Sequence, residues 1–324
     1  MIKGKHTRIG GGAKFWSGNT AMVGGLISKP VIINQQNFVS SPSMPSWLTL
    51  TRLSTATRFD NTGTLVDVAA DTARFDYAYN GASWANQGLL LEKAATNLFA
   101  YSNNWPDTSA ISVVNMVVSG GYVLSTSATD TQRAYSSNSI SVTASNPTTT
   151  TALVSKLNNL GTKINLNSAD SSSDAGVVSI GFAPNTSNIK QEYFSDNKVK
   201  ASYTRSADYS GNIYGVYKYA ANRRSDIRLE FMQVEVGSYP TSFIKTSGTA
   251  VTRAQDNLQL NVSKYTGSIK LTYKRQDTGA TESTWIDLAN ATNPILTNSV
   301  AVGIWLQNIA VYNRTLTAQE KANA

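Results

Sequence analysis

Short apolar runs alternate with turn residues along most of this 324-residue chain, at the spacing of antiparallel strands rather than helices. Residues 64–68, Thr-Leu-Val-Asp-Val, alternate polar and apolar side chains as a half-buried strand does. The preceding Asn61-Thr62-Gly63 is a turn signal and predicts a hairpin. Residues 268–274 alternate in the same way. The pattern predicts an all-β protein made of antiparallel sheets.

The middle of the chain contains many further apolar runs, broken by Ser, Asn and Gly. Their number suits a sandwich of two antiparallel sheets, as in a jelly roll. The polar tract 168–173 predicts a loop. The expected strands lie near 111–118, 122–125, 140–142, 152–157, 177–182, 191–194, 198–204, 213–219 and 227–236.

Two blocks of the sequence carry a resemblance to a known family. The first block comprises Thr51-Arg52, residues 56–60, Arg74-Phe75-Asp76, residues 88–92 and Thr96-Asn97-Leu98, and the second comprises residues 231–237, 240–244 and 251–256. The first resembles a module of tailed-bacteriophage fibre and spike proteins. The second resembles the closing strand of the carbohydrate-binding jelly roll that usually follows that module. The matching residues are mostly structural and do not name a ligand.

The end of the chain adds a second resemblance, which bears on domain organisation. Residues 309–320 look like the last strand and terminal turn of concanavalin-like lectin domains, in which Leu316 would close the sheet and Thr317 would cap a short helix. We expect 47–96 and 257–324 to pair into one small, reduced lectin-like β domain. The carbohydrate-binding-like jelly roll, 97–256, would then be inserted between them.

Residues 1–46 differ from the rest, because Gly and Pro interrupt their short apolar patches. Such a segment can hardly form a core of its own, so we expect an extended N-terminal arm that attaches to other virion proteins. The alternative is an ordered strand packed on its own domain. The apolar residues expected to make the attachment are Phe15, Trp16, Val31, Ile32 and Ile33.

Composition narrows the classes of function. The chain has no Cys, which excludes disulfides and thiolate chemistry, and its 15% of charged residues with 15 Tyr suit a polar β protein. The first residues contain no apolar run of signal-peptide length, and no run is long enough for a membrane helix, so neither export by that route nor membrane insertion is expected. The net charge of +8 is scattered, which indicates a solvated basic surface rather than nucleic-acid binding.

Catalytic and metal chemistry find little support in the sequence. The sole histidine is His6, so the folded body cannot contain a Ser-His-Asp triad. Residues 170–174 offer oxygen ligands but lack the Gly and distal Glu of an EF-hand, so a polar loop is favoured over calcium. We expect no enzyme activity, no cofactor and no metal. The carboxylates considered for a glycosidase pair are Asp196, Asp208, Asp226, Glu230 and Glu235, the last two predicted on opposite faces of one strand.

Sugar binding uses aromatic faces together with planar polar groups, because the C–H face of a pyranose stacks on a ring and its hydroxyls need partners. The richest such neighbourhood is our candidate glycan site, with Trp84 and Trp105 as second choices. The alternative is that these tyrosines pack between sheets. The candidate residues are Tyr203, Arg205, Tyr209, Tyr214, Tyr217, Tyr219, Arg223 and Arg224.

Together, the patterns and the resemblance predict a bacteriophage virion protein, assembled in the host cytoplasm as a fibre, spike or tail-tip component. It would bind host surface glycans through its sandwich and form a homotrimer. One alternative is a capsid decoration or baseplate spacer without a ligand. A polysaccharide depolymerase is a third, less favoured hypothesis.

Overall fold

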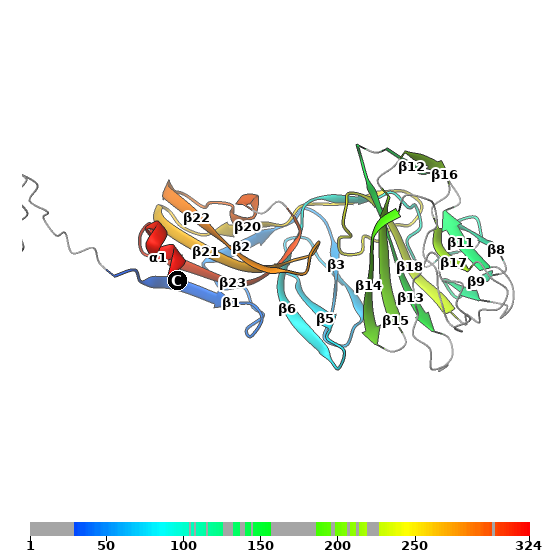
Figure 1. Ribbon diagram of the computed structural model, residues 1–324, viewed down its shortest axis with the longest axis horizontal. Coiled ribbons are helices and arrows are strands. Elements are labelled where there is room, and N and C mark those ends of the chain that lie inside the picture. The colour runs from blue at the N-terminus through cyan, green and yellow to red at the C-terminus, as the bar shows by residue number, and fades with distance from the viewer. Residues whose placement is uncertain are drawn as a thin grey trace, which may run out of the picture.

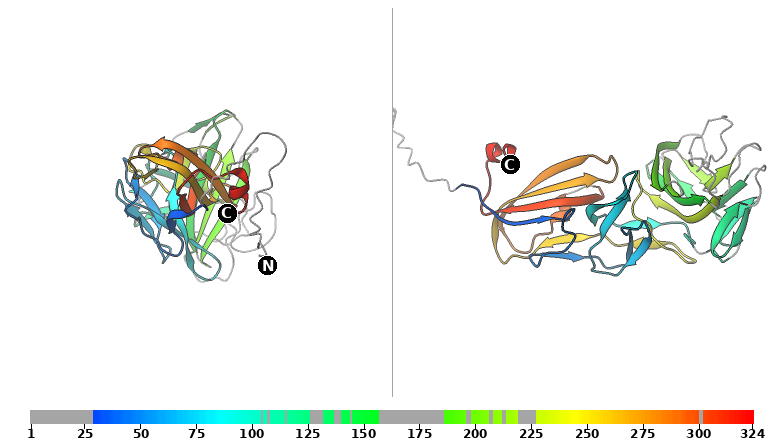
Figure 2. Two further views of the ribbon diagram at one scale, coloured as in Figure 1. Left: turned by 90° about the vertical axis from the view of Figure 1, so that its left-hand side faces the viewer. Right: turned by 90° about the horizontal axis from the view of Figure 1, so that it is seen from below.

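The computed structural model describes residues 29–324 apart from 104, 107, 115, 126–131, 137–139, 144, 157–185, 196–197, 206–207, 212–213, 219–226 and 300–301. Strands make up 57% of the structure and helices 3%, and the sheets are antiparallel, which confirms the predicted all-β sandwich class. The molecule is elongated (Figure 1, Figure 2). We call residues 29–94 and 254–324 the base lobe and residues 98–250 the insert lobe.

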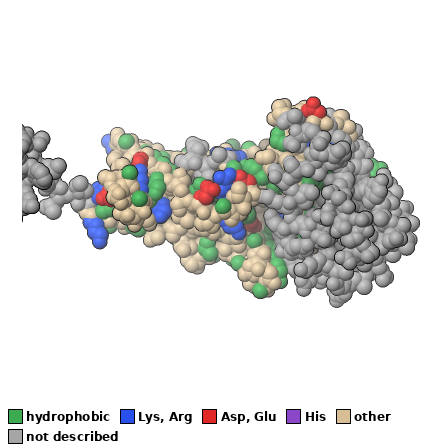
Figure 3. Space-filling view, in the orientation of Figure 1, with side chains coloured by type: hydrophobic (Ala, Val, Ile, Leu, Met, Phe, Trp, Pro, Cys, Tyr) green, Lys and Arg blue, Asp and Glu red, His purple; other side chains and the backbone are tan. Residues whose placement is uncertain are grey.

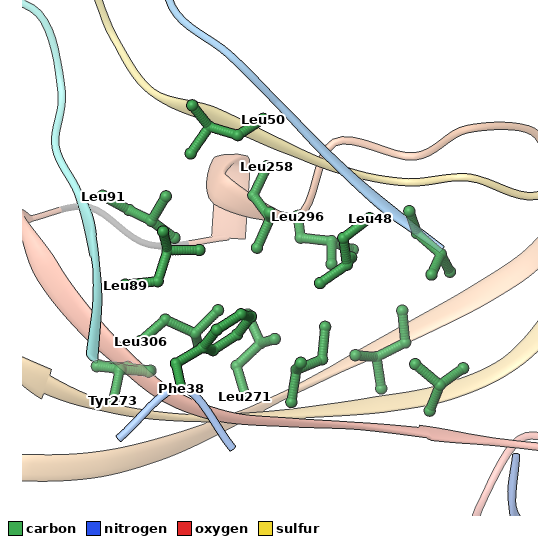
Figure 4. Packing of buried hydrophobic residues seen from close by; sticks show 14 of the residues in the cluster. Phe38, Leu48, Leu50, Leu89, Leu91, Leu258, Leu271, Tyr273, Leu296 and Leu306 are labelled. Carbon is green, nitrogen blue, oxygen red and sulfur yellow. The ribbon is translucent and has the colours of Figure 1, made fainter. Parts of the chain in front are cut away.

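The base lobe is built on a six-stranded antiparallel sheet. The strand order is β22-β21-β23-β6-β5, and β1 also pairs with β23. A short ladder of β2 (Leu48–Thr51) and β20 (Asn257–Leu260), with the 3-10 helix η1 (Leu296–Ser299), lies over one face of this sheet (Figure 4). The sheet strands are β1 (Ile32–Asn37), β5 (Phe75–Tyr79), β6 (Trp84–Leu91), β21 (Tyr265–Arg275), β22 (Thr281–Ala291) and β23 (Ile304–Tyr312).

Leucine side chains fill the space between the ladder and the sheet (Figure 4). Leu48 and Leu50 are buried while Thr49 and Thr51 are exposed, because alternate residues of a strand point to opposite faces. Burying each such leucine stabilises the fold by roughly 1.5–3 kcal/mol. This cluster also contains Phe38, Leu89, Leu258, Leu260, Leu271, Leu296 and Leu306.

Segments from both ends of the chain share the base lobe. Strand β2 pairs with β20, and β6 pairs with β23. The chain enters the insert lobe through β7 (Ala95–Asn97) and returns through β19 (Val251–Arg253), and these two strands pair with each other. Both connections to the insert lobe therefore lie side by side. The division into separately folding domains stays a prediction.

The insert lobe contains a large sheet with strand order β14-β15-β13-β18-β10-β9, a three-stranded sheet β17-β11-β8 and a pair β12-β16. Buried apolar residues from the first two, among them Val154, Val199, Leu229, Ile111 and Ala134, form one core. The expected strand at 177–182 lies outside the described residues. The strands are β8 (Ile111–Val114), β9 (Met116–Ser119), β10 (Tyr122–Ser125), β11 (Gln132–Ser136), β12 (Ile140–Val142), β13 (Thr148–Lys156), β14 (Thr186–Ser195), β15 (Lys198–Arg205), β16 (Tyr209–Gly211), β17 (Tyr214–Lys218) and β18 (Ile227–Val236).

Strand β1 corrects the predicted extent of the N-terminal arm. The arm was expected to reach residue 46, but residues 32–37 pair with β23 and the side chain of Phe38 is fully buried in the base-lobe core. The ladder hydrogen bonds and the burial of Phe38 thus hold this segment on its own lobe. Residues 1–28, with Phe15 and Trp16, lie outside the described residues.

Two local predictions are confirmed. The turn at Asn61-Thr62-Gly63 joins β3 (Ala56–Phe59) to β4 (Leu65–Val68), and Gly63 adopts a φ of 80°, which glycine reaches without strain. Near the end of the chain, Thr317 caps α1 (Ala318–Ala322) and forms a capping box with Glu320.

Candidate functional site

Five charged side chains, four from the base lobe and one from β19, meet in the interior with no exposed surface. This junction ion cluster consists of Arg52, Arg74, Glu92, Arg253 and Asp256. Asp256 lies 2.9 Å from Arg52 and 2.5 Å from Arg74. Glu92 lies 2.9 Å from Arg74 and 3.4 Å from Arg253. The cluster therefore ties the segment before the insert lobe to the segment after it.

The charges of the junction ion cluster stabilise one another. Burial opposes ionisation of Glu92, but Arg253 and Arg74 outweigh it and hold the pKa of that carboxyl well below its usual range. Ser242 also donates to Glu92 from its backbone N–H (2.7 Å) and its hydroxyl (2.6 Å). A cluster without solvent exposure cannot meet a ligand, so its role is structural.

Arg52, Arg74 and Glu92 lie in the first of the two sequence blocks described above, and Arg253 and Asp256 lie in the second. Three of the scattered basic residues are thus buried rather than solvated. Arg52, Arg74 and Arg253 are among the largest fully buried side chains of the described structure. A buried charge is stable only when it is paired, and the two carboxylates supply that pairing.

A second polar region is open to solvent. A groove of about 480 Å³ lies between the β3–β4 hairpin and the large sheet of the insert lobe. Buried Leu153 and Phe231 contribute its apolar lining. Trp84 and the hairpin turn line it from the base lobe, while Tyr122 lines it from β10.

A β-bulge in β18 helps to shape this groove. Leu153 pairs with Phe231 and Val154 pairs with Leu229, which leaves Glu230 as an extra residue in the ladder. Leu229 and Met232 pack into the insert-lobe core, so both intervening residues, Glu230 and Phe231, line the groove. Bulges re-aim side chains in this way. Regular alternation would have turned one of the two away.

Glu230 holds a cluster of cations at the groove. Its Oε2 lies 2.8 Å from Lys198 Nζ, while its Oε1 accepts from Arg228 (2.6 Å) and Ser155 (2.7 Å). Burial would raise the pKa of Glu230, but Lys198 and these other donors lower it. The carboxylate thus stays ionised and fixes the positions of the cations.

Two aromatic side chains line the same groove. Tyr122 is 38% exposed, and the Arg228 guanidinium lies 4.5 Å from its ring centroid. Trp84 packs against Phe59 and Tyr79, with ring centroids 5.8 and 6.0 Å apart. A Cβ on Gly63 would lie only 2.2 Å from Cζ2 of Trp84, so glycine lets the hairpin turn press on the indole. Both rings are held in place before any ligand arrives.

Among the described residues, none of the predicted glycan residues lines this groove. Tyr203 and Arg205 are 2% and 3% exposed, so burial removes the open face that the prediction required of them. Tyr209 lies in β16, and Tyr214 and Tyr217 lie in β17. The remaining three, Tyr219, Arg223 and Arg224, lie outside the described residues.

Of the two second choices, Trp84 lines the groove, whereas Trp105 is 1% exposed and belongs to the insert-lobe core. Tyr122 and Lys198 line the groove but were not among the predicted site residues. The Gly120-Gly121 turn before Tyr122 was a usable signal, because a tight turn presents the following side chain at the end of a hairpin.

The attachment residues that the structure describes lie at the edge strand of the base lobe. Val31, Ile32 and Ile33 are 51%, 44% and 50% exposed. Strand β1 pairs with β23 through one of its edges. These three consecutive apolar side chains thus remain available for contact, although their strand belongs to the sheet.

Among the predicted catalytic candidates, Glu230 and Glu235 were expected on opposite faces of one strand. That prediction is wrong, because the bulge in β18 turns both side chains away from the insert-lobe core. At about 3.3 Å per residue they lie about 16 Å apart along the strand, beyond the roughly 5–10 Å of a glycosidase pair. Burial also raises the pKa of Glu235. Asp208 is exposed, and Asp196, Asp226 and the 170–174 loop lie outside the described residues.

Within the described ranges, no group of three or more His, Cys, Asp or Glu side chains is placed to hold a metal ion. In the same part of the chain, no helix has the length and apolar character needed to cross a membrane. Scans against models of protein families and against curated proteins find no match to this chain.

Proposed function

We propose that this protein is a non-enzymatic bacteriophage virion component, a fibre, spike or tail-tip protein, that binds host surface glycans through its β-sandwich. The observation that carries the proposal is the open groove, where Tyr122 and Trp84 lie beside Lys198 and Glu230. Aromatic rings and fixed polar groups in one open hollow are what a pyranose requires.

The rigidity of the groove supports binding over a spacer role. Arg228 stacks on Tyr122, and Gly63 presses on Trp84, so the binding surface costs little ordering when a ligand arrives. A single open groove of this kind binds sugar weakly, with Kd on the order of 1 mM, and many copies on one particle raise the overall adhesion.

Attachment to the particle is assigned to the N-terminal segment and the exposed apolar residues Val31, Ile32 and Ile33. Exposed apolar side chains at an edge strand favour contact with another protein. Other virion proteins and two further copies of this chain, in a homotrimer, are the proposed partners. Nucleic acid is not a proposed partner, because basic side chains are interspersed with acidic and polar ones on the face drawn in Figure 3.

A glycan array probed with the full chain tests the proposal. The wild type should bind a subset of bacterial surface glycans, and Tyr122→Ala should lose most of that binding because it removes the exposed ring. Tyr77→Ala is the matched control, since this half-buried tyrosine lies in β5 outside the groove.

If the wild type binds no glycan on the array, the capsid-decoration or baseplate-spacer alternative is favoured. Equal loss in both tyrosine variants would point to misfolding, and their melting temperatures separate that case. Release of reducing ends from capsule or lipopolysaccharide would instead favour the depolymerase.

A further inference from the structure

The charged groups of the groove offer many donors and few acceptors. Lys198 and Lys245 both line it, and each ammonium carries three N–H donors. Glu230 is the only acidic residue among the described residues of the lining. Its Oε1 already accepts from Ser155 and Arg228, and its Oε2 faces Lys198. The carboxylate is thus engaged by the protein itself.

This balance is the opposite of what a neutral sugar needs. A hydroxyl both donates and accepts, so a site for neutral sugar benefits from a free carboxylate or carbonyl that takes the hydroxyl proton. An oxyanion only accepts. It is served best by ammonium groups that are fixed nearby and still have donors to spare.

We propose that the groove binds an acidic saccharide, one that carries a carboxylate or a sulfate on its ring. This inference rests on the proposed glycan-binding function. Lys198 is the principal contact, held in place by Glu230, and Lys245 is the second. The ring of the sugar lies against Tyr122.

The second contact is available at little cost. Lys245 pairs with Asp67 at 2.8 Å, but their side chains are 37% and 64% exposed. Exposed ion pairs contribute little to stability, so an incoming oxyanion can displace Asp67 from Lys245. Counting Arg228 as well, three cations face two carboxylates, Glu230 and Asp67, which leaves a net charge of +1 at the groove.

The test is titration of the full chain with three oligosaccharides of equal length: oligogalacturonate, a sulfated galactan fragment and a neutral galactan fragment. One or both acidic probes should bind at least about tenfold more tightly than the neutral one, since hydrogen bonds to charged groups are the stronger kind. Tighter binding of oligogalacturonate would identify a carboxylate as the preferred acidic group, and tighter binding of the sulfated galactan fragment would identify a sulfate. The preference should fall as NaCl rises from about 0.05 M to about 0.5 M.

Two variants of the groove give opposite expectations. Lys198→Gln should weaken binding of the acidic probe about tenfold. Glu230→Gln should strengthen it severalfold, because the amide oxygen still accepts from Lys198 and Arg228 and holds them in place, while the competing negative charge is removed. Lys270→Gln is the charge-matched control, because Lys270 lies over Trp285 in the base lobe and outside the groove.

The outcomes separate the two proposals. If the neutral probe binds as tightly as the acidic ones, or if Glu230→Gln abolishes binding in a variant that melts normally, the acidic-saccharide inference is wrong while glycan binding stands. If no saccharide binds the wild type at all, the proposed function fails, and the inference fails with it.

Discussion

The junction ion cluster and the groove use the same chemistry with opposite exposure. In the cluster, Arg52, Arg74 and Arg253 surround Glu92 and Asp256, and the side chains are 0% exposed. At the groove, Lys198 and Arg228 surround Glu230, and their exposures are 29%, 36% and 11%. Exposure decides the role: buried pairs hold the lobe together, whereas partly exposed pairs remain within reach of a ligand.

Energetics separates the two regions as well. Removing one partner of a buried ion pair leaves an uncompensated charge and costs about 3–5 kcal/mol. An exposed pair contributes about 0–1 kcal/mol. Substitutions in the cluster should therefore destabilise the fold most, while substitutions of the charged side chains at the groove should mainly change binding.

The largest expected effect follows from Asp256→Asn. The variant leaves Arg52 and Arg74 without their shared carboxylate, and we expect a loss of about 3–5 kcal/mol in the free energy of unfolding. Chemical denaturation measures it. The control is Asp67→Asn, which breaks the exposed pair with Lys245. A similar loss of stability in both variants would contradict the difference between buried and exposed ion pairs.

Acid should weaken the junction ion cluster. The folded pKa of Glu92 is depressed, so its contribution is present above the unfolded pKa of about 4.3 and is lost as pH falls below it. Burial raises the pKa of Asp76 and of Glu235, and their effect has the opposite sign: stability decreases as pH rises from the unfolded pKa toward the folded one.

The contribution of Glu92 is isolated by measuring stability between pH 2 and pH 7 in the wild type and in Glu92→Gln. The variant should be less stable at neutral pH and should lose less stability on acidification. If the two pH profiles run parallel, Glu92 does not carry the acid dependence assigned to it.

A smaller effect is expected at the wall of the groove. Gly63→Ala should destabilise by about 1–3 kcal/mol and shift the Trp84 ring, because the added Cβ would meet the indole. Near-ultraviolet circular dichroism reports the ring. Gly81→Ala also carries a positive φ, at 99°, but its Cβ meets nothing within 4 Å. It therefore separates backbone strain from the clash.

The smallest effect is expected at a partly exposed surface pair, Arg314 with Glu320. The pKa of Glu320 is lowered to about 2 by Arg314 and by the cap of α1. The folded pKa is depressed, so this contribution holds above about pH 4.5 and disappears toward pH 2. Carboxyl NMR titration measures the pKa directly. In Glu320→Gln, α1 should fray while the melting temperature stays nearly unchanged.

Local patterns predicted the all-β class and the hairpin turn at Gly63, because both depend on neighbouring residues. The cap at Thr317 was expected from the lectin-like resemblance of residues 309–320. The five residues of the junction ion cluster lie within the two quoted sequence blocks, but the sequence did not predict their pairing or burial, because both depend on packing between distant segments.

The candidate site was predicted far less well. Tyr122, Lys198 and Glu230 meet only after β10, β15 and β18 take their places in one sheet, and the bulge at Glu230 breaks the alternation on which sequence reasoning depends. Tyr203 shows the converse, because a tyrosine suited to sugar stacking is equally suited to a buried strand.

The most direct test of the groove is an NMR titration of the six tryptophan indole N–H signals with an acidic oligosaccharide, assigned by Trp84→Phe and Trp105→Phe. The account predicts that the Trp84 signal shifts on binding while that of buried Trp105 stays in place. Binding that moves other indoles and leaves Trp84 unchanged would contradict it.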